Sequence, residues 1–139
     1  MRIVIDASAL LATVLPEHDA RLRDVASVAL VDHDLLAPAV WPFEVAGGLA
    51  KAEWMQRIST ETSTFIWSAL RPLLASTEVD MPVDASRIFE VCRRYSLRGA
   101  DATYLELAAR ERVALLTGDG SLARACRAAD IELVYDPNA

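Results

Sequence analysis

The chain has 139 residues, enough for a sizeable core, and we expect residues 1–139 to form one domain. Its hydrophobic fraction of 53% with only 6% aromatic residues predicts a core of Ala, Val, Leu and Ile, as in layered α/β packing. The sequence has no apolar run near the ~20 residues of a membrane span and no signal-peptide pattern, so we expect a cytoplasmic protein that does not enter a membrane. The net charge of −6 argues against binding nucleic acid by charge alone, although divalent ions bound to acids would attract phosphate.

Predicted strands and helices alternate along the chain. The β-branched run Ile3, Val4 and Ile5 favours a buried strand, and the alternation implies a parallel sheet with right-handed crossovers. In chain order, the predicted elements are a strand over 3–5, helices over 8–15 and 17–31, a strand over 35–37, helices over 39–55 and 60–75, a strand over 78–81, helices over 83–95 and 102–112, a strand over 113–117, a helix over 122–129 and a strand over 131–135.

Two of the predicted strands end at an acid. Asp6 follows the first strand, and Asp119 follows the apolar strand over 113–117 in the same way. Ligands of open α/β sheets bind at the carboxyl ends of strands, so both acids are candidate functional residues. The alternative is structural, because Asp6 or Ser8 could cap the next helix. If the two strands are neighbours in the sheet, Asp6 and Asp119 face one crevice.

Two helix starts supply further acids. Glu44 lies on an apolar, small-residue side of its helix, close to Gly47 and Gly48, which suggest the close approach of another backbone or a ligand. Asp101 stands at a predicted helix N-terminus, where it could also be only a cap and a partner of the helix dipole. An exposed Glu44 at an ordinary helix start is the corresponding structural alternative.

Four carboxylates in one pocket would need a counter-charge. Each close pair repels by about 1 to 4 kcal/mol at a separation of about 4 Å, depending on the local dielectric. Such a cluster persists only with bound cations or raised pKa values. Oxygen ligands without His or Cys favour Mg²⁺ or Mn²⁺ over zinc, and the chemistry typical of such sites is metal-assisted phosphodiester hydrolysis.

Four motifs in this order and spacing resemble the PIN-domain ribonucleases, specifically the VapC-type toxins of type II toxin–antitoxin pairs. The resemblance extends over essentially the whole chain. The motifs are Ile-Asp-Ala-Ser-Ala-Leu at 5–10, Trp-Pro-Phe-Glu-Val at 41–45, Asp-Ala-Thr-Tyr-Leu-Glu-Leu-Ala at 101–108 and Leu-Leu-Thr-Gly-Asp-Gly-Ser-Leu at 115–122.

The resemblance implies a fold, a site and an activity. The fold would be a PIN-like three-layer α/β fold, with a five-stranded parallel sheet in the order 3-2-1-4-5 between helices. The activity would be Mg²⁺- or Mn²⁺-dependent endonucleolytic cleavage of RNA by a homodimer that a cognate antitoxin inhibits. The implied catalytic and metal-binding residues are Asp6, Glu44, Asp101 and Asp119, and the hydroxyls that would support them belong to Ser8 and Thr117.

Further functions remain open at this point. Receiver domains and haloacid dehalogenases also place an Asp after the first strand, but both need a lysine late in the chain, and Lys51 is the only lysine. The haloacid dehalogenases also need a second acid where this chain has Ser8. The protein could also be a housekeeping RNA-processing PIN nuclease or a non-catalytic PIN-like binding module.

Two surface regions are candidates for binding. The predicted helical hairpin over 39–75 could be a dimer interface, an antitoxin groove or core, because it carries the large apolar side chains Trp54, Met55, Phe65 and Trp67. Arginines shortly before Asp101 could contact RNA phosphates or form a solvated face. These are Arg93, Arg94 and Arg98.

Overall fold

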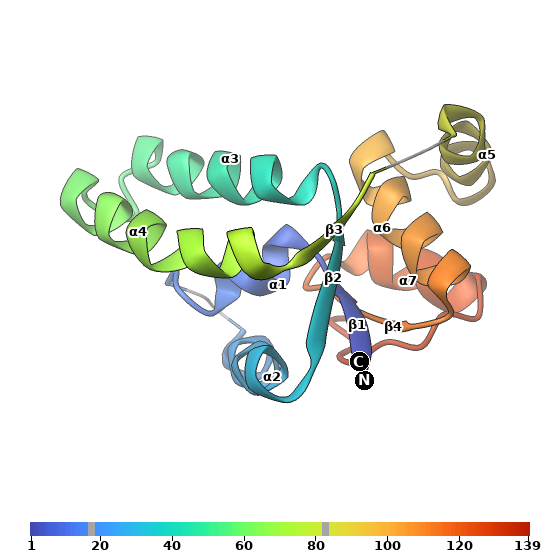
Figure 1. Cartoon of the computed structure of the whole chain (residues 1–139), viewed down its shortest axis with the longest axis horizontal. Coiled ribbons are helices and arrows are strands. Elements are labelled where there is room, and N and C mark those ends of the chain that lie inside the picture. Colours follow the sequence, from blue (N-terminus) through green and yellow to red (C-terminus); the bar gives the residue numbers. More distant parts are fainter. Residues whose placement is uncertain (17–18, 82–83) are drawn as a thin grey trace.

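A four-stranded parallel sheet lies at the centre of the molecule (Figure 1). The computed structural model describes residues 1–16, 19–81 and 84–139. The strand order is β3-β2-β1-β4, with β1 between two partners and its residues Ile3, Val4 and Ile5 fully buried. The strands are β1 (Arg2–Ile5), β2 (Asp34–Pro38), β3 (Glu78–Asp80) and β4 (Ala114–Leu116).

The first and fourth strands are direct neighbours. Ile3 of β1 pairs with Ala114 of β4, and Ile5 pairs with Leu116, so both strands end at the same edge of the sheet. This pairing confirms the predicted adjacency and the order of the first four strands. The acids that follow the two strands are therefore brought to one edge.

The expected fifth strand over 131–135 is reduced to one bridge. Leu133 forms an isolated parallel bridge with Leu115, flanked by hydrogen bonds that join Leu115 to Glu132 and Val134 at 3.0 Å each. The segment follows a left-handed turn at Asp130 (φ 57°) and pairs with β4 only at Leu133. The described sheet thus has four strands rather than the predicted five.

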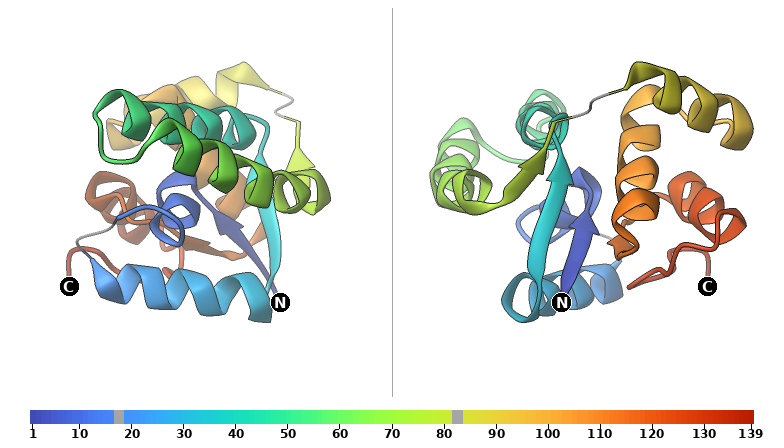
Figure 2. Two further views of the ribbon diagram at one scale, coloured as in Figure 1. Left: turned by 90° about the vertical axis from the view of Figure 1, so that its left-hand side faces the viewer. Right: turned by 45° about the vertical axis from the view of Figure 1, so that its right-hand side comes forward.

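Helices cover both faces of the sheet (Figure 2). On one face of the sheet, α6 contacts β1, β2 and β4, and α5 and α7 flank α6. On the other face, α1 packs against α2 and α3, and α3 packs against α4. This gives the predicted three-layer α/β arrangement. The helices are α1 (Ala7–Ala12), α2 (Ala20–Asp32), α3 (Trp41–Trp54), α4 (Thr60–Ser76), α5 (Ala85–Tyr95), α6 (Gly99–Glu111) and α7 (Gly120–Ala128).

Several helix starts differ from the prediction in ways that matter for the acids. The side chain of Asp6, and not that of Ser8, caps α1, so the predicted capping role of Ser8 is wrong. The helix predicted to begin after Asp101 begins at Gly99, which places Asp101 inside its first turn rather than at the cap. Asp119 is the cap of α7. The predicted helices over 17–31 and 83–95 begin on residues outside the described ones.

One of the two glycines of α3 lies in close packing. A Cβ atom added to Gly48 would lie 2.4 Å from Cδ1 of Leu11, whereas one added to Gly47 would meet nothing within 4 Å. The predicted close approach therefore holds for Gly48, where α3 meets the side chain of Leu11 on α1. It does not hold for Gly47.

The α3–α4 hairpin leaves bulky apolar side chains in solvent. Trp54 is 77% exposed, Phe65 75% and Met55 60%, while Trp67 is half-buried against the core. Figure 1 shows the two helices side by side, extending from the sheet away from α5. The described helices include none long and apolar enough to cross a membrane.

The helix α5 packs on the outside of α6. It has no buried residue and packs against α6 through the half-buried side chains Ile88, Val91 and Cys92. Arg87, Arg93 and Arg94 are exposed, as the sequence pattern predicts.

Candidate functional site

Asp6 is fixed at the end of β1 by three hydrogen bonds. Its Oδ1 accepts from Oγ of Ser8 at 2.7 Å and from the backbone N–H of Ala9 at 2.9 Å, and its Oδ2 accepts from the hydroxyl of Thr117. The residue is only 4% exposed. A carboxylate has about four lone-pair positions, so these bonds leave one, on Oδ2, for a further ligand. Capping and ligand binding are thus compatible roles for Asp6.

The hydroxyls of Ser8 and Thr117 tie the end of β1 to the loop after β4. Thr117 is fully buried, and while it donates to Asp6 its Oγ1 accepts the backbone N–H of Asp119 at 2.9 Å. Oγ of Ser8 accepts the N–H of Gly118 at 2.9 Å. The loop that carries Asp119 is therefore positioned by the same groups that orient Asp6.

One carboxylate oxygen of Asp119 caps α7, and the other forms no hydrogen bond within the described residues. Its Oδ1 accepts the N–H groups of Ser121 at 2.8 Å and Leu122 at 3.3 Å, which caps α7. Within the described residues no hydrogen bond to Oδ2 is formed. That oxygen keeps its full capacity to accept.

Glu44 is oriented by a residue that the sequence pattern did not single out. The hydroxyl of Tyr104 donates to Oε1 of Glu44 at 2.6 Å, although the two residues are sixty positions apart in the chain. Burial, and after it this hydrogen bond and the Glu44 charge, raise the pKa of Tyr104, so the phenol stays a proton donor. A usable signal exists, since a buried tyrosine hydroxyl needs a polar partner.

Asp101 lies in the electrostatic field of the other acids. Burial raises its pKa most, the charges of Asp119 and Glu44 raise it further, and Arg98 opposes the shift. The pKa of Asp6 is raised to about 6, mainly by burial and also by the charge of Asp119, against the effect of its hydrogen bonds. The four predicted acids are therefore coupled electrostatically in pairs: Asp6 with Asp119, and Asp101 with Asp119 and Glu44.

The donor set has the chemistry of a hard divalent cation site. The donors at this edge are carboxylate and hydroxyl oxygens, which favour Mg²⁺ or Mn²⁺ over softer metals. However, residues 1–16, 19–81 and 84–139 contain no group of three or more Asp, Glu, His or Cys side chains that could hold a metal ion as they are now oriented. The residue types fit such a cation, and closing a ligand sphere around it would require the side chains to move together.

The sequence matches the model of one protein family over most of its length. The model of the PIN domain matches residues 3–128. The chain belongs to the PIN domain family. This confirms the family resemblance of the four sequence motifs. No curated protein matches the chain closely enough to count as a relative.

Solved structures share this PIN fold at low sequence identity. A toxin–antitoxin complex from Klebsiella pneumoniae has a TM-score of 0.64 at 19% identity, covering 96% of this chain and 98% of that one. FitAcB from Neisseria gonorrhoeae has a TM-score of 0.66 at 19% identity, covering 99% and 98%. VapBC2 from Rickettsia felis, solved with a fragment of promoter DNA, has a TM-score of 0.64 at 13% identity, covering 96% and 97%.

The raised pKa of Asp6 predicts a pH-dependent stability. Folding raises this pKa from 3.8 to about 6, so the folded state binds more protons in this window and its stability falls as the pH rises through it. In buffer with a chelator, the free energy of unfolding of the wild type relative to Asp6→Asn should fall by up to about 3 kcal/mol between pH 4 and pH 7. Urea titrations measure this difference. Asp24→Asn, at an exposed position, is the matched control, and a pH-independent difference for Asp6→Asn would contradict the assignment.

Proposed function

We propose that the protein is a metal-dependent endoribonuclease that hydrolyses RNA phosphodiester bonds, and that it is the toxin of a toxin–antitoxin pair. PIN domains are generally nucleases, and the match to that family extends over residues 3–128. The observation that carries the proposal is that Asp6 and Asp119 follow two neighbouring strands, β1 and β4, and that Asp101 is electrostatically coupled to Asp119 and Glu44. A housekeeping RNA-processing nuclease would use the same site, and a non-catalytic binding module would lack cleavage.

Four side chains would hold the cation, which we take to be Mg²⁺ or Mn²⁺. The available acceptors are Oδ2 of Asp6 and of Asp119, Oε2 of Glu44, and the carboxylate of Asp101, none of which is saturated by hydrogen bonds within the described residues. The chemistry that such a cation supplies when bound is the activation of water and the stabilisation of the leaving oxygen.

The chain's own residues prepare this site. Thr117 and Ser8 hold Asp6 in one orientation, so its remaining acceptor position points in a fixed direction. The hydroxyl of Tyr104 occupies one oxygen of Glu44 and leaves the other for the site. The carboxylate of Asp101 accepts no hydrogen bond within the described residues. Of the four acids, it is therefore the one whose substitution should disturb folding least.

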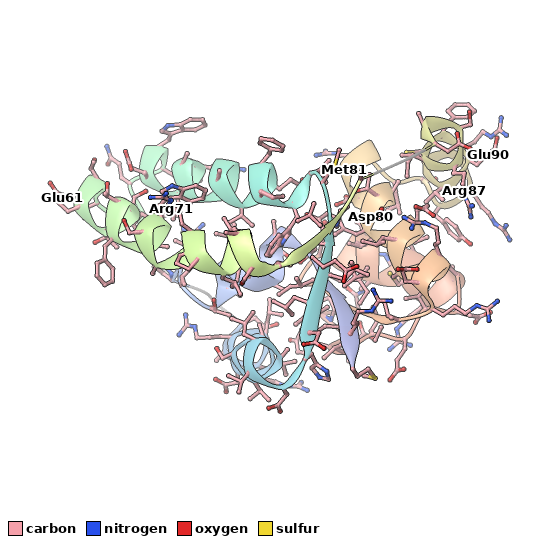
Figure 3. All side chains as sticks on the ribbon, viewed as in Figure 1. Glu61, Arg71, Asp80, Met81, Arg87 and Glu90 are labelled. Atoms are coloured by element: carbon pink, nitrogen blue, oxygen red, sulfur yellow. The ribbon has the colours of Figure 1, made fainter. Side chains whose placement is uncertain are left out.

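The activity is tested most cleanly at Asp101. Purified wild-type protein should cleave single-stranded RNA with Mg²⁺ or Mn²⁺ and lose cleavage with a chelator. Asp101→Asn should lower the cleavage rate by about 100-fold or more, because the residue supplies a carboxylate oxygen to the site, while its melting temperature stays close to that of the wild type. Glu61→Gln on α4, labelled in Figure 3 and exposed, is the control. Full cleavage by Asp101→Asn, or no cleavage of any RNA by the wild type, would reject the proposal.

Tyr104 should act as a positioning residue for Glu44. Tyr104→Phe keeps the buried ring and removes only the hydroxyl, so we expect a folded protein with weaker Mn²⁺ binding, by several-fold, and slower cleavage. Isothermal titration with Mn²⁺ measures the first effect separately from catalysis. If Tyr104→Phe lowers stability but leaves Mn²⁺ affinity and the pH profile of cleavage unchanged, its role is only structural.

The exposed apolar face of the α3–α4 hairpin is our candidate surface for the antitoxin. Trp54 and Phe65 are more than two-thirds exposed, and large apolar side chains left in solvent are candidate interface residues. Toxin–antitoxin complexes are among the solved structures with this fold. The homodimer implied by the family resemblance is the competing use of this face.

Substitutions on the α3–α4 hairpin should show whether it binds the antitoxin or a second copy of the chain. Trp54→Ser with Phe65→Ser should weaken antitoxin binding by at least about tenfold, because each large side chain buries apolar area worth about 1.5–3 kcal/mol. Phe89→Ser on α5, also an exposed apolar position, is the matched control. Binding is measured with the purified antitoxin and self-association by sedimentation. Loss of the dimer alone would assign the face to self-association, and unchanged values for both would reject an interface here.

A further inference from the structure

A hollow next to the acids is bordered by arginines. It lies between the end of α5 with the loop that follows it and one side of α7 along its length, and we name it the α5–α7 groove. Leu97 is buried at its base, and Ser96 turns the chain there with a φ of 55°. Its lining residues are Arg94, Tyr95, Ser96, Leu97, Ser121, Arg124, Ala125 and Ala128.

The arginines at this groove lack acidic partners among the described residues. Some arginines outside the groove pair with carboxylates, as Arg110 does with Asp80 at 2.7 Å and Arg93 with Glu90 at 2.8 Å. By contrast, Arg94, Arg98 and Arg124 form no ion pair with a described carboxylate. Arg94 and Arg124, which line the groove, therefore bring two positive charges without an ion-pair partner among the described residues to a chain with a net charge of −6.

Neutral contacts hold two of these guanidinium groups in place. The guanidinium carbon of Arg94 lies 5.5 Å from the ring centroid of Tyr95. Arg124 donates to Oγ of Ser121 at 3.2 Å and to Oδ1 of Asn138 at 3.4 Å. These contacts restrict the side chains without neutralising them, so both guanidinium groups keep N–H donors for an anion.

Both walls of the groove continue into the acidic site. On the α7 wall, the N–H of Ser121 donates to Oδ1 of Asp119 at 2.8 Å. On the other wall, the lining loop runs into Arg98, which immediately precedes α6 and acts electrostatically on Asp101. An extended anionic chain lying in the groove would therefore reach the acids at one end.

We propose that the α5–α7 groove binds the phosphate backbone of single-stranded RNA beside the bond that is cleaved, with Arg94 and Arg124 as phosphate ligands. This inference rests on the proposed nuclease function. Guanidinium groups bind phosphate oxygens through paired N–H donors, and the Arg94–Tyr95 pair provides a planar surface on which a base can stack. The groove supplies the positive charge that the chain as a whole lacks.

The test measures RNA binding separately from cleavage. A fluorescent single-stranded RNA of about twelve nucleotides is titrated with protein in a chelator, and anisotropy is followed at several salt concentrations. Arg94→Ala with Arg124→Ala should weaken binding by about tenfold or more and reduce the slope of log affinity against log salt by about 1.4, since each lost phosphate contact on a single strand contributes about 0.7. Both side chains are exposed, so the melting temperature should not change.

Matched variants make the outcome specific. Arg71→Ala removes one positive charge on α4, far from α5 in Figure 3, and Arg71→Ala with Arg57→Ala removes two, the same number as the groove variant. An equal loss of affinity in this control, or no loss in the groove variant, would overturn the proposal. Unchanged RNA binding with weakened antitoxin binding would make the groove a protein site and also overturn it.

Cleavage assays distinguish this inference from the function on which it rests. If the wild type cleaves RNA and the groove variant does so with the same kcat/KM, the groove proposal fails and the nuclease stands. If the wild type binds RNA through these arginines but cleaves none with metal present, the nuclease proposal fails and the groove stands.

Discussion

The hydrogen bond from Thr117 to Asp6 joins the two halves of the site. It links the residue after β1 to the residue after β4, and the same hydroxyl accepts the backbone N–H of Asp119. The parallel pairing of the two strands brings these ends together, and the buried hydroxyl fixes how the two acids face each other. A buried polar group needs such partners, so folding and site geometry depend on one small network.

This network has an energetic consequence for an acid cluster. Burial and the charge of Asp119 disfavour the ionised form of Asp6, while three hydrogen bonds favour it. Asp101 is subject to burial and to two neighbouring negative charges, with only Arg98 opposing them. The fold therefore holds Asp6 and Asp101 where their ionisation is unfavourable without a counter-ion.

The residues differ in how far local sequence determined their placement. Asp6 and Asp119 were predictable because each follows an apolar run at a strand end, and Gly48 because a mid-helix glycine implies close packing. The burial of Tyr104 predicts that its hydroxyl needs a polar partner, but not that the partner is Glu44, because the two residues lie sixty positions apart on α6 and α3. The reduction of the fifth strand to one bridge at Leu133 likewise depends on backbone pairing, which periodicity does not reveal.

Helix α5 forms one wall of the α5–α7 groove, and its local stability differs from that of the rest of the fold. No residue of this helix is buried, and α6 is the main element against which it packs. Helices held by so little apolar contact open in low-energy, sub-global steps while the rest of a domain stays folded. The backbone amides of α5 would then exchange with solvent faster than those of β1, and an anion bridging α5 and α7 would slow that exchange. In this fold, ligand binding and the closing of a weakly held helix are thermodynamically linked.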